Sequence, residues 1–530
     1  MKDLLFYGGP ILTMQAEQDG PAARAEAVLV RGDKIAAVGS LKALREMTAD
    51  AQPVNLQGCC LLPGFLDAHS HFLQYANTLQ FCQLGRCTSW GDVQQALRDF
   101  IARAGLKPGQ PVVGFGYDQN IMHEGKHPTR QVLDEVSTES PIMCAHASGH
   151  MGVANSAMLK LMGLTDDTPD PQGGRYGRDA EGHLDGLLEE NAFIQRQALP
   201  QGDPGDKLAK MTALLEQAQD IYFSYGITTA QEGMLDPDSF EVYRAAGDAG
   251  KLKMDVIGYA DMRNCPDLPA QFPAYLKQYK NHFKMGGYKI FLDGSPQGRT
   301  AWMLDDYADE PGYRGYPVYE DAQVDAYVQK AQAEDMPLLC HCNGDAAAAQ
   351  FIRCHRQPSA QRDVMIHSQL LHADQMPAMK AAGIMPSFFP AHTWYWGDAH
   401  IHHMGYDRAS KISAAASAKA LGLPYTFHMD TPVLPPDCLD ILFCVTNRVT
   451  RDGVKLDQSE ALSTYDALKG ITCNAAWQYY EEDTKGTLAP GKLADLVILS
   501  EDPTAIDPAD LRRIKVLATI KGGETVFRKV

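Results

Sequence analysis

The chain has 530 residues, of which 45% are hydrophobic and 22% charged, and its formal net charge is −18. This length exceeds one ordinary domain, so we expect a large unit together with a smaller one. The composition is that of a globular protein and excludes fibrous and disordered classes. The strong negative charge disfavours nucleic acid and anionic membrane surfaces as partners, because both repel an acidic protein.

The start of the chain has an apolar stretch that is interrupted by Gly8, Gly9 and Pro10, which is typical of a strand and turn rather than a signal peptide. No apolar run reaches the length of a membrane span. The twelve cysteines lack the spacing of a disulfide scaffold or a zinc ribbon, so we interpret them as structural thiols. We therefore expect a cytoplasmic protein.

Both ends of the chain carry short apolar runs that are separated by turns. Near the start, Arg31-Gly32-Asp33 separates two such runs as a hairpin turn would. Near the end, Leu493–Ser500 and Val516–Phe527 show the same pattern. We predict that residues 1–60 and 478–530 together form a β-sandwich domain.

Between these ends, apolar runs alternate with helical patterns, as in βα units around a parallel sheet. Eight such runs are present, which is the number that closes a (β/α)₈ barrel. The runs are CLLPGFLDAHSH from Cys60, GITTAQE from Gly226, KMDVIGYA from Lys253, GGYKIFLDG from Gly286, MPLLCHC from Met336, DVMIHS from Asp363, GIMPSFF from Gly383 and LPYTFHMD from Leu423. The fold class predicted from them is α/β, with a TIM barrel over residues 61–477.

The first and second runs are separated by a segment that is far longer than a βα connection. We place an insertion at residues 72–205, with short strands of its own in PVVGFGY and PIMCAH. Such an excursion after the first barrel strand is a candidate lid and specificity region over the barrel mouth.

The first run ends in His69-Ser70-His71. Alternate side chains of a strand face the same way, so His69 and His71 are expected to point inward together and to share one metal. Asp67 lies on the same face, where it would orient a ligand as a hydrogen-bond acceptor. An HxH pair alone is weak evidence, because histidine is often a core or surface residue. Its position at a strand end strengthens the metal interpretation.

Three other runs end in residues of the same chemical type. His341 closes the fifth run, His367 the sixth and Asp430 the eighth, each at the C-terminal end where barrel enzymes place their catalytic groups. Imidazole and carboxylate ligands suit zinc, with Mn²⁺ and Fe²⁺ as alternatives. The sequence therefore predicts a centre of one or two divalent metal ions.

The fourth run contributes Lys289, which shares its predicted inward face with Phe291 and Asp293. A buried lysine is costly unless it is neutralised or paired. Either it forms a salt bridge to a carboxylate such as Asp293, or its amine has become a carbamate, an anionic ligand that bridges two metals. The residues alone leave both possibilities open.

In order along the chain, the motifs PGFLDAHSH, GITT, YKIFLDGS, CHCNGD, IHSQLLH, FHMDTPV and GTLAPGKLADLVIL resemble the amidohydrolase superfamily, specifically its family 3 or YtcJ-like branch. The resemblance covers essentially the whole chain and implies a distorted (β/α)₈ barrel with a β-sandwich from both termini. It also implies a carboxylated Lys289 that bridges two metals. The implied ligands are His69, His71 and Asp430 for the first metal and His341 and His367 for the second.

The sequence departs from this family in one motif. Asp430 stands in HMDTP, where related sequences usually have a Gly-Ser-Asp turn. The carboxylate is kept, but the local backbone is expected to differ.

The resemblance also implies a mechanism. A water between cations about 3.5 to 4 Å apart loses a proton near neutral pH and becomes a hydroxide nucleophile. Asp430 would accept that proton as general base and return it to the leaving amine as general acid. One metal would polarise the scissile carbonyl. An unmodified Lys289 would instead favour a single-metal site.

Four further residues are candidates for contacting substrate, and each has a structural alternative. A helix cap or core role is the alternative for His150, and an ion pair with a nearby Asp is the alternative for Arg299. Trp394 would otherwise pack in an aromatic loop with its neighbours, and Asp293 would otherwise pair with Lys289. A second histidine cluster fits a solvated surface and receives no role: His400, His402 and His403.

The leading hypothesis is a metal-dependent hydrolase that cleaves an amide-type C–N bond, other than a peptide bond, in a small or medium organic molecule. One alternative is a catalytically silent or regulatory binding protein on the same fold, which retention of every expected ligand opposes. Another is a deaminase or an esterase of the same superfamily, because barrel folds host many reactions. The expected partners are a small-molecule substrate and a second copy in a homodimer.

Overall fold

A computed structural model of the chain describes residues 3–48, 50–147, 149, 151–171, 174–195 and 204–529. The chain divides into two compact units. The larger comprises Met1–Phe72, Gln219–Thr431 and Pro435–Val530, and the smaller comprises Leu73–Ala218 and Pro432–Leu434. The predicted insertion at 72–205 corresponds in sequence to the smaller unit, and its place over the barrel mouth stays a prediction.

The larger unit contains an eight-stranded sheet in which all neighbouring strands are parallel. Side chains of the central strands are buried on both faces, as expected for a parallel sheet that is covered on both sides. In spatial order the strands are β6 (Phe65–Leu66), β13 (Ile227–Leu235), β14 (Asp255–Asp261), β15 (Phe283–Phe291), β16 (Leu338–Cys342), β17 (Asp363–His367), β18 (Ile384–Phe388) and β19 (Thr426–Phe427).

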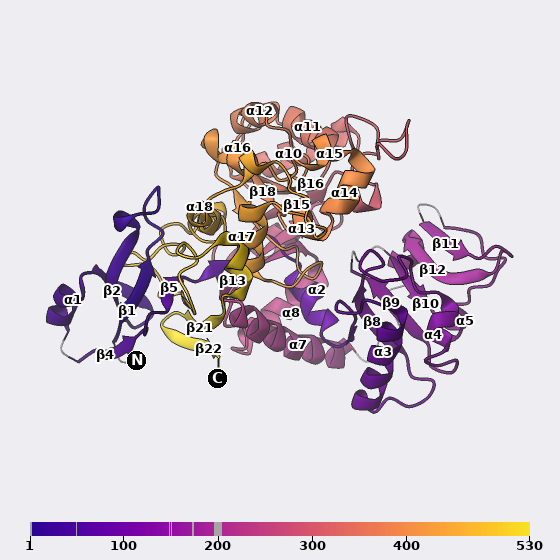
Figure 1. Ribbon diagram of the computed structural model, residues 1–530, viewed down its shortest axis with the longest axis horizontal. Helices are drawn as coiled ribbons and strands as arrows, with labels where there is room; N and C mark the ends of the chain where they lie inside the picture. The colour runs from indigo at the N-terminus through magenta and orange to yellow at the C-terminus, as the bar shows by residue number, and fades with distance from the viewer. Residues whose placement is uncertain are drawn as a thin grey trace. The chain divides into compact units, whose positions relative to one another are not determined.

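Helices follow the strands and surround the curled sheet (Figure 1). Two of them, α7 (Pro204–Ser224) and α10 (Asp321–Ala333), occupy segments in which the spacing of apolar residues predicts outer helices. The others on this sheet include α8 (Pro237–Asp248), α11 (Asp345–Cys354), α12 (Met376–Ala381), α14 (Gly397–Met404), α16 (Ala415–Ala420) and α17 (Cys438–Asn447). The alternation confirms the predicted distorted (β/α)₈ barrel.

The first and last strands of this sheet meet across a connecting segment. The N–H of Leu66 in β6 donates to the carbonyl of Ile471 (2.9 Å), and the N–H of Phe427 in β19 donates to the carbonyl of Gly470 (3.2 Å). A Cβ at Gly470 would lie 2.3 Å from the ring of Phe427, so this approach requires glycine. Beyond the strands, the N–H of His71 donates to the carbonyl of Thr431 (2.7 Å). The two strand ends are thereby held together.

The prediction that the first run forms a single strand is wrong, because the run is divided between two sheets. Cys60–Pro63 forms β5, which pairs with β20 (Leu496–Leu499) in the terminal sheet, and only Phe65–Leu66 enters the barrel. Gly64 lies at the division, where a Cβ would be 2.6 Å from the Thr228 side chain. Regular strand geometry therefore ends at Leu66, before the two histidines.

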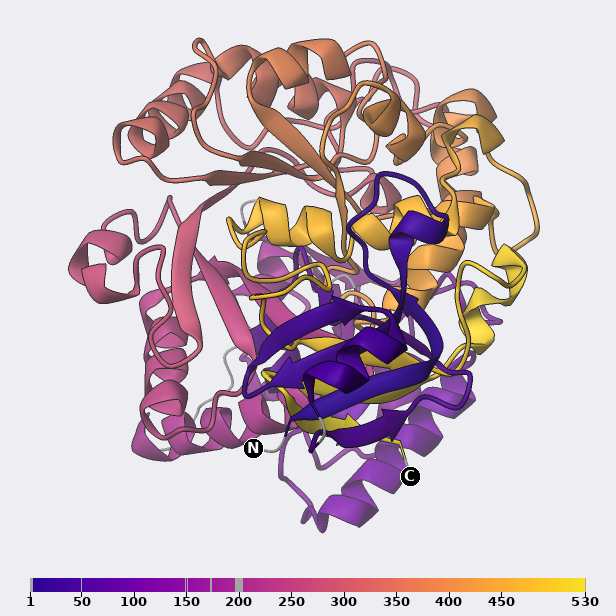
Figure 2. The same cartoon turned by 90° about the vertical axis from the view of Figure 1, so that its left-hand side faces the viewer.

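Both ends of the chain form one sheet with the order β22-β21-β20-β5-β1-β2-β3, and β4 lies beside β1. Figure 2 shows the indigo N-terminal strands beside the yellow C-terminal ones. Its apolar core takes side chains from both ends, including Phe6, Leu61 and Leu496. The remaining strands are β1 (Leu4–Leu12), β2 (Arg24–Arg31), β3 (Lys34–Gly39), β4 (Gln52–Asn55), β21 (Val516–Lys521) and β22 (Glu524–Arg528). The predicted β-rich domain from both termini is confirmed.

The smaller unit has its own sheet, with the order β11-β12-β10-β9-β8-β7. Val93 and Leu97 of helix α3 (Trp90–Ala104) join its apolar core. The strands are β7 (Cys82–Gln83), β8 (Val112–Tyr117), β9 (Ile142–His146), β10 (Met151–Ala154), β11 (Gly174–Arg178) and β12 (Leu184–Glu190). The two short strands predicted within the insertion are β8 and β9.

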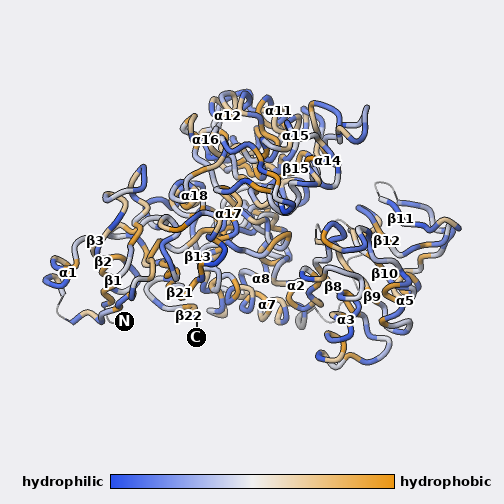
Figure 3. Tube along the Cα trace, in the orientation of Figure 1, coloured by the Kyte–Doolittle hydropathy of each residue, from blue (hydrophilic) through white to orange (hydrophobic). Residues whose placement is uncertain are grey.

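Figure 3 shows hydrophobic and hydrophilic stretches alternating along the chain, as expected when strands are buried and loops are exposed. Among the described residues, no helix combines the length and the apolar character that crossing a bilayer requires. All twelve cysteines are free thiols, and ten of them are buried.

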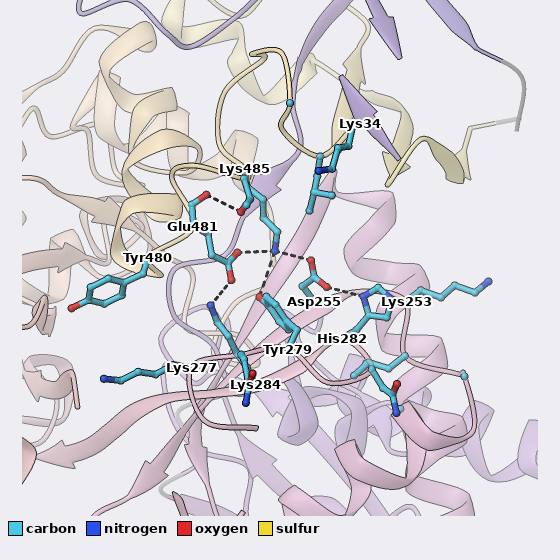
Figure 4. A pocket seen from close by; sticks show the side chains of 18 residues that line it. Lys34, Lys253, Asp255, Lys277, Tyr279, His282, Lys284, Tyr480, Glu481 and Lys485 are labelled. Carbon is cyan, nitrogen blue, oxygen red and sulfur yellow. Dashed lines mark hydrogen bonds and ion pairs between the residues drawn. The ribbon is translucent and has the colours of Figure 1, made fainter. Parts of the chain in front are cut away.

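A network of buried charges lies at the N-terminal ends of β14 and β15, beside a pocket of about 790 Å³ (Figure 4). Lys485 contacts both Asp255 (2.6 Å) and Glu481 (2.7 Å). Lys521, at the end of β21, contacts the same Asp255 (2.5 Å). Burial alone would raise the pKa of Asp255. The positive charges of Lys485 and Lys521 have the larger effect and hold this pKa well below its usual value. The network thus links the terminal sheet to the barrel.

We expect Asp255→Asn to reduce the free energy of unfolding by about 3 kcal/mol, because breaking a buried ion pair leaves an uncompensated charge. The depressed pKa of Asp255 means that its contribution is complete above about pH 4 and is lost as the pH falls through the folded-state pKa. Chemical denaturation at neutral and acidic pH measures both effects. Glu241→Gln breaks an exposed pair with Arg244 and is the control, with a loss below about 1 kcal/mol. Equal losses in the two variants would contradict a role for the network.

Candidate metal centre

His69, His71 and Asp430 converge at the C-terminal ends of the first and last barrel strands. One ligand atom from each lies within 4.8 Å of the other two. The Nε2 atoms of His69 and His71 are 3.4 and 3.6 Å from Oδ1 of Asp430. Both histidines lie beyond β6, so their convergence comes from the contact between the strand ends and not from strand alternation.

Lys289 of β15 lies beside this group with its side chain fully buried. Its Nζ is 3.2 Å from Nε2 of His69, and it forms no ion pair within the described part of the chain. The expected alternative of a salt bridge to Asp293 is therefore not observed. Burial lowers the pKa of Lys289 to about 8, with Asp430 acting in the opposite direction.

His341 of β16 and His367 of β17 form the second arm of the site. Nδ1 of His341 is 3.1 Å from Nε2 of His367, which in turn is 3.9 Å from Oδ2 of Asp430. Nε2 of His341 faces the carbonyl of Gly294 (3.3 Å), so Nδ1 is the nitrogen that points toward the site. These two residues adjoin the first group without joining its 4.8 Å cluster.

Burial keeps the imidazoles of the site neutral. It lowers the pKa of His69 and His367 well below the usual value and that of His71 to about 3, and the nearby Lys289 lowers all three further. A neutral imidazole offers the lone pair that a metal ion requires. Three nitrogen and carboxylate donors around one point therefore fit a divalent ion such as zinc.

The ring of His69 is oriented by Gln231 of β13, which the sequence analysis missed. Nδ1 of His69 lies 2.5 Å from Oε1 of Gln231, whose amide nitrogen donates to the carbonyl of Ala68 (2.7 Å). This bond directs Nε2 of His69 toward the site. Asp67, which was predicted for this role, instead accepts from the backbone N–H of His69 (3.3 Å). Burial raises the pKa of Asp67 to about 7.

Three residues at the site have a left-handed backbone that is unfavourable for side chains other than glycine. They are His367 (φ 70°), Ser368 (φ 46°) and Asp430 (φ 53°). Such conformations cost on the order of 1 kcal/mol or more each and cluster at functional sites. Asp430 belongs to the HMDTP turn, whose backbone we expected to differ from that of the Gly-Ser-Asp turn. That difference stays a prediction.

Asp293 has a structural role in the loop that follows β16. Its carboxylate accepts hydrogen bonds from the backbone N–H groups of Asn343 (2.9 Å), Gly344 (2.7 Å) and Trp302 (3.0 Å). Burial raises its pKa to about 7, against these three hydrogen bonds. Asp293 thereby positions the loop that follows His341, and its contact with substrate stays a prediction.

Two other substrate candidates also lie in structural contacts. Arg299, 42% exposed, pairs with Glu310 (2.9 Å) and Asp309 (3.7 Å), which is the alternative stated for it. The ring of Trp394 packs against Phe443 and under the guanidinium of Arg512 (4.3 Å). Neither contact involves the metal donors, and the substrate contacts of both residues stay predictions. His150 lies outside the described residues.

The second histidine cluster is divided by the structure. His400 is fully buried, which corrects the expectation of a solvated surface for that residue. His402 and His403 lie at the surface near Asp309, at 3.9 and 2.7 Å. The His403 contact is a hydrogen bond that already engages the carboxylate of Asp309.

The fold and this donor set define a (β/α)₈ barrel with a metal centre at the C-terminal ends of its strands. The model of the amidohydrolase family matches residues 52–527, and the chain therefore belongs to the amidohydrolase family. Membership supports a hydrolytic activity and a divalent metal.

Relatives match the chain over nearly its full length. YtcJ of Bacillus subtilis (strain 168) is 28% identical over 99% of each chain. An N-substituted formamide deformylase of Arthrobacter pascens is 26% identical over 99% of this chain and 98% of its own. Among solved structures, an uncharacterized metal-dependent hydrolase from Pyrococcus horikoshii OT3 superposes with a TM-score of 0.75 at 22% identity, covering 96% of this chain and 99% of its own.

Gly233 on β13 sets the space for the His69 ring. A Cβ at this position would lie 2.4 Å from Cε1 of His69 and 2.9 Å from the carbonyl of Ser70. We expect Gly233→Ala to displace His69 and to lower the affinity for Zn²⁺ by at least about 10-fold, as loss of ligand orientation does elsewhere. Competition with a chelating dye measures this. Gly39→Ala is the matched control on strand β3, where a Cβ meets only an ordinary contact at 3.5 Å. Unchanged affinity in Gly233→Ala would show that His69 is not held against this glycine.

Proposed function

We propose that the chain is a metal-dependent hydrolase of amide-type C–N bonds in small or medium organic molecules. The convergence of His69, His71 and Asp430 beside the buried Lys289 carries this proposal. The N-substituted formamide deformylase among its relatives supports the choice of a C–N bond. The site stands at the C-terminal ends of the barrel strands, where barrel enzymes perform catalysis.

The donor set favours zinc, held by His69, His71 and Asp430, with His341 and His367 adjoining. A divalent ion bound there would lower the pKa of a bound water molecule and polarise the carbonyl of the substrate. The carboxylate of Asp430 accepts the proton of the attacking water and returns it to the leaving nitrogen. Gln231 keeps Nε2 of His69 directed at the site, and burial keeps the rings dry and unprotonated.

We also propose that Lys289 is carboxylated. Its buried Nζ has no carboxylate partner within the described part of the chain and lies next to His69. In the reaction, the neutral amine forms an N–C bond to CO₂, one C=O π pair moves onto oxygen, and the nitrogen releases one proton. The product is an anionic carbamate, which would neutralise the positive charge that two metals bring to the site.

We expect the purified protein to contain zinc, and its turnover to be lost with a chelator and with His69→Ala. Metal analysis is paired with a panel of N-substituted formamides and N-acylated amines, with esters and ring amidines added for the esterase and deaminase alternatives. His183→Ala is the control, because this exposed imidazole pairs only with Asp166 in the smaller unit. It should retain both metal and activity.

The outcomes of this experiment separate the alternatives. Stoichiometric metal without turnover of any compound would favour a binding protein on the same fold. Turnover of esters alone would identify an esterase, and turnover of ring amidines alone would identify a deaminase. Turnover that persists without metal would refute the proposal.

The carbamate is tested by ¹³C nuclear magnetic resonance after exchange with ¹³C-labelled bicarbonate. We expect one carbamate resonance in the wild type and none in Lys289→Arg, whose guanidinium does not react with CO₂. Activity and metal content should fall when CO₂ is removed and recover when bicarbonate is restored. A wild-type spectrum without the resonance, at full metal loading, would mean an unmodified lysine.

A further inference from the structure

A fifth histidine, which the sequence analysis did not single out, lies inside the metal centre. His428 directly follows β19 and precedes Asp430 by two residues, and its side chain is 0% exposed. Its ring centroid is 5.2 Å from that of His69 and 5.1 Å from that of His367. The centroids of His69 and His367 are themselves 5.8 Å apart, so the ring of His428 adjoins both arms of the site.

Neither ring nitrogen of His428 has a hydrogen-bond partner in the described part of the chain. The backbone of Ser387 approaches the ring and favours its protonated form without reaching hydrogen-bond geometry. A buried polar group without a partner costs about 1 to 3 kcal/mol. Buried groups of this kind are normally satisfied by protein, ordered water or a ligand, so the ring nitrogens are available to a partner from outside the protein.

The separations between the ring centres are those of imidazoles that share an ion, although the nitrogens of His428 do not join the cluster of ligand atoms within 4.8 Å of one another that His69, His71 and Asp430 form. A zinc–nitrogen bond is about 2.1 Å long, so two imidazoles that bind one tetrahedral ion have ring centres about 5 Å apart. The pair His69 and His71, expected to share a metal, has a separation of 5.3 Å. His428 has this relation to both His69 and His367, whereas Phe389 on its other side offers only an apolar face at 5.1 Å.

We propose that His428 is an additional ligand of the divalent metal centre. The inference rests on the proposed function, because it presumes that a metal occupies this site. It assigns a role to the departure at HMDTP, where the imidazole of His428 stands at the first position of the turn that usually reads Gly-Ser-Asp. The centre would then be richer in nitrogen donors, which suits zinc, cobalt or nickel better than magnesium or manganese.

The test compares metal binding by the full-length wild type with that of His428→Phe and His428→Gly. Phenylalanine keeps a ring of similar size without a lone pair, and glycine restores the small residue of the usual turn. His400→Phe is the matched control, because His400 is equally buried but belongs to no group of metal donors among the described residues. Dye competition gives Zn²⁺ affinity, and the visible absorption of the Co²⁺-loaded protein reports the number and type of ligands.

We expect both His428 variants to lose at least about 10-fold in Zn²⁺ affinity and to show shifted Co²⁺ bands, while His400→Phe keeps both properties. Where His428→Phe does not fold, as judged by circular dichroism, His428→Gly alone decides. Unchanged affinity and an unchanged Co²⁺ spectrum would overturn the inference, and an accompanying rise in KM would assign His428 to substrate contact instead. If His69→Ala loses the metal and the His428 variants keep it, only this inference fails. If the wild type binds no metal, the proposed function fails with it.

Discussion

The site depends on the contact between the first and last strands of the barrel sheet. β6 and β19 are only two residues long, and the segment at Gly470 and Ile471 bonds to both. The candidate metal donors that follow these two strands are far apart in sequence, and this contact brings them close together. Gly470 is essential to it, because any side chain there would strike the Phe427 ring. A catalytic geometry is thus fixed by backbone hydrogen bonds below the site.

The interior of the site gathers nitrogen donors without the charges that usually compensate them. Burial keeps the imidazoles neutral, and Lys289 adds a positive charge when protonated. Asp430 is the carboxylate that faces His69 and His71, and Asp293 lies 3.7 Å from Nε2 of His341 on the other arm. A cation at these donors would meet lone pairs and, unless Lys289 is carboxylated, a single negative charge, so its affinity would depend on orientation more than on net charge. Gln231 and Gly233 supply that orientation for His69.

The sequence predicted the barrel, the terminal sheet and the residues that meet at the site. Those features follow from apolar runs and from polar residues at their ends, which are local signals. Side-chain direction is not local, so the contacts of Arg299 with Glu310 and of Trp394 with Arg512 could not be predicted from their own segments. Gln231 resembles any polar residue of a strand, and Gly64 gave no sign that it divides two sheets. His428 was not identified as a candidate ligand, because only Asp430 was considered in the motif that contains both residues.

The left-handed backbone at His367, Ser368 and Asp430 sets a limit on how this protein can change. Glycine would relax each of these positions and stabilise the fold, but at two of them it would delete a donor. Selection for thermal stability alone would therefore tend to erode the centre, and selection for activity would preserve a locally unfavourable chain. Ser368 is the exception, since relief there removes no ligand. There glycine would relax the backbone but remove the buried hydrogen bond from the Ser368 hydroxyl to the carbonyl of Met365 (2.8 Å), so part of the gain in stability would be offset.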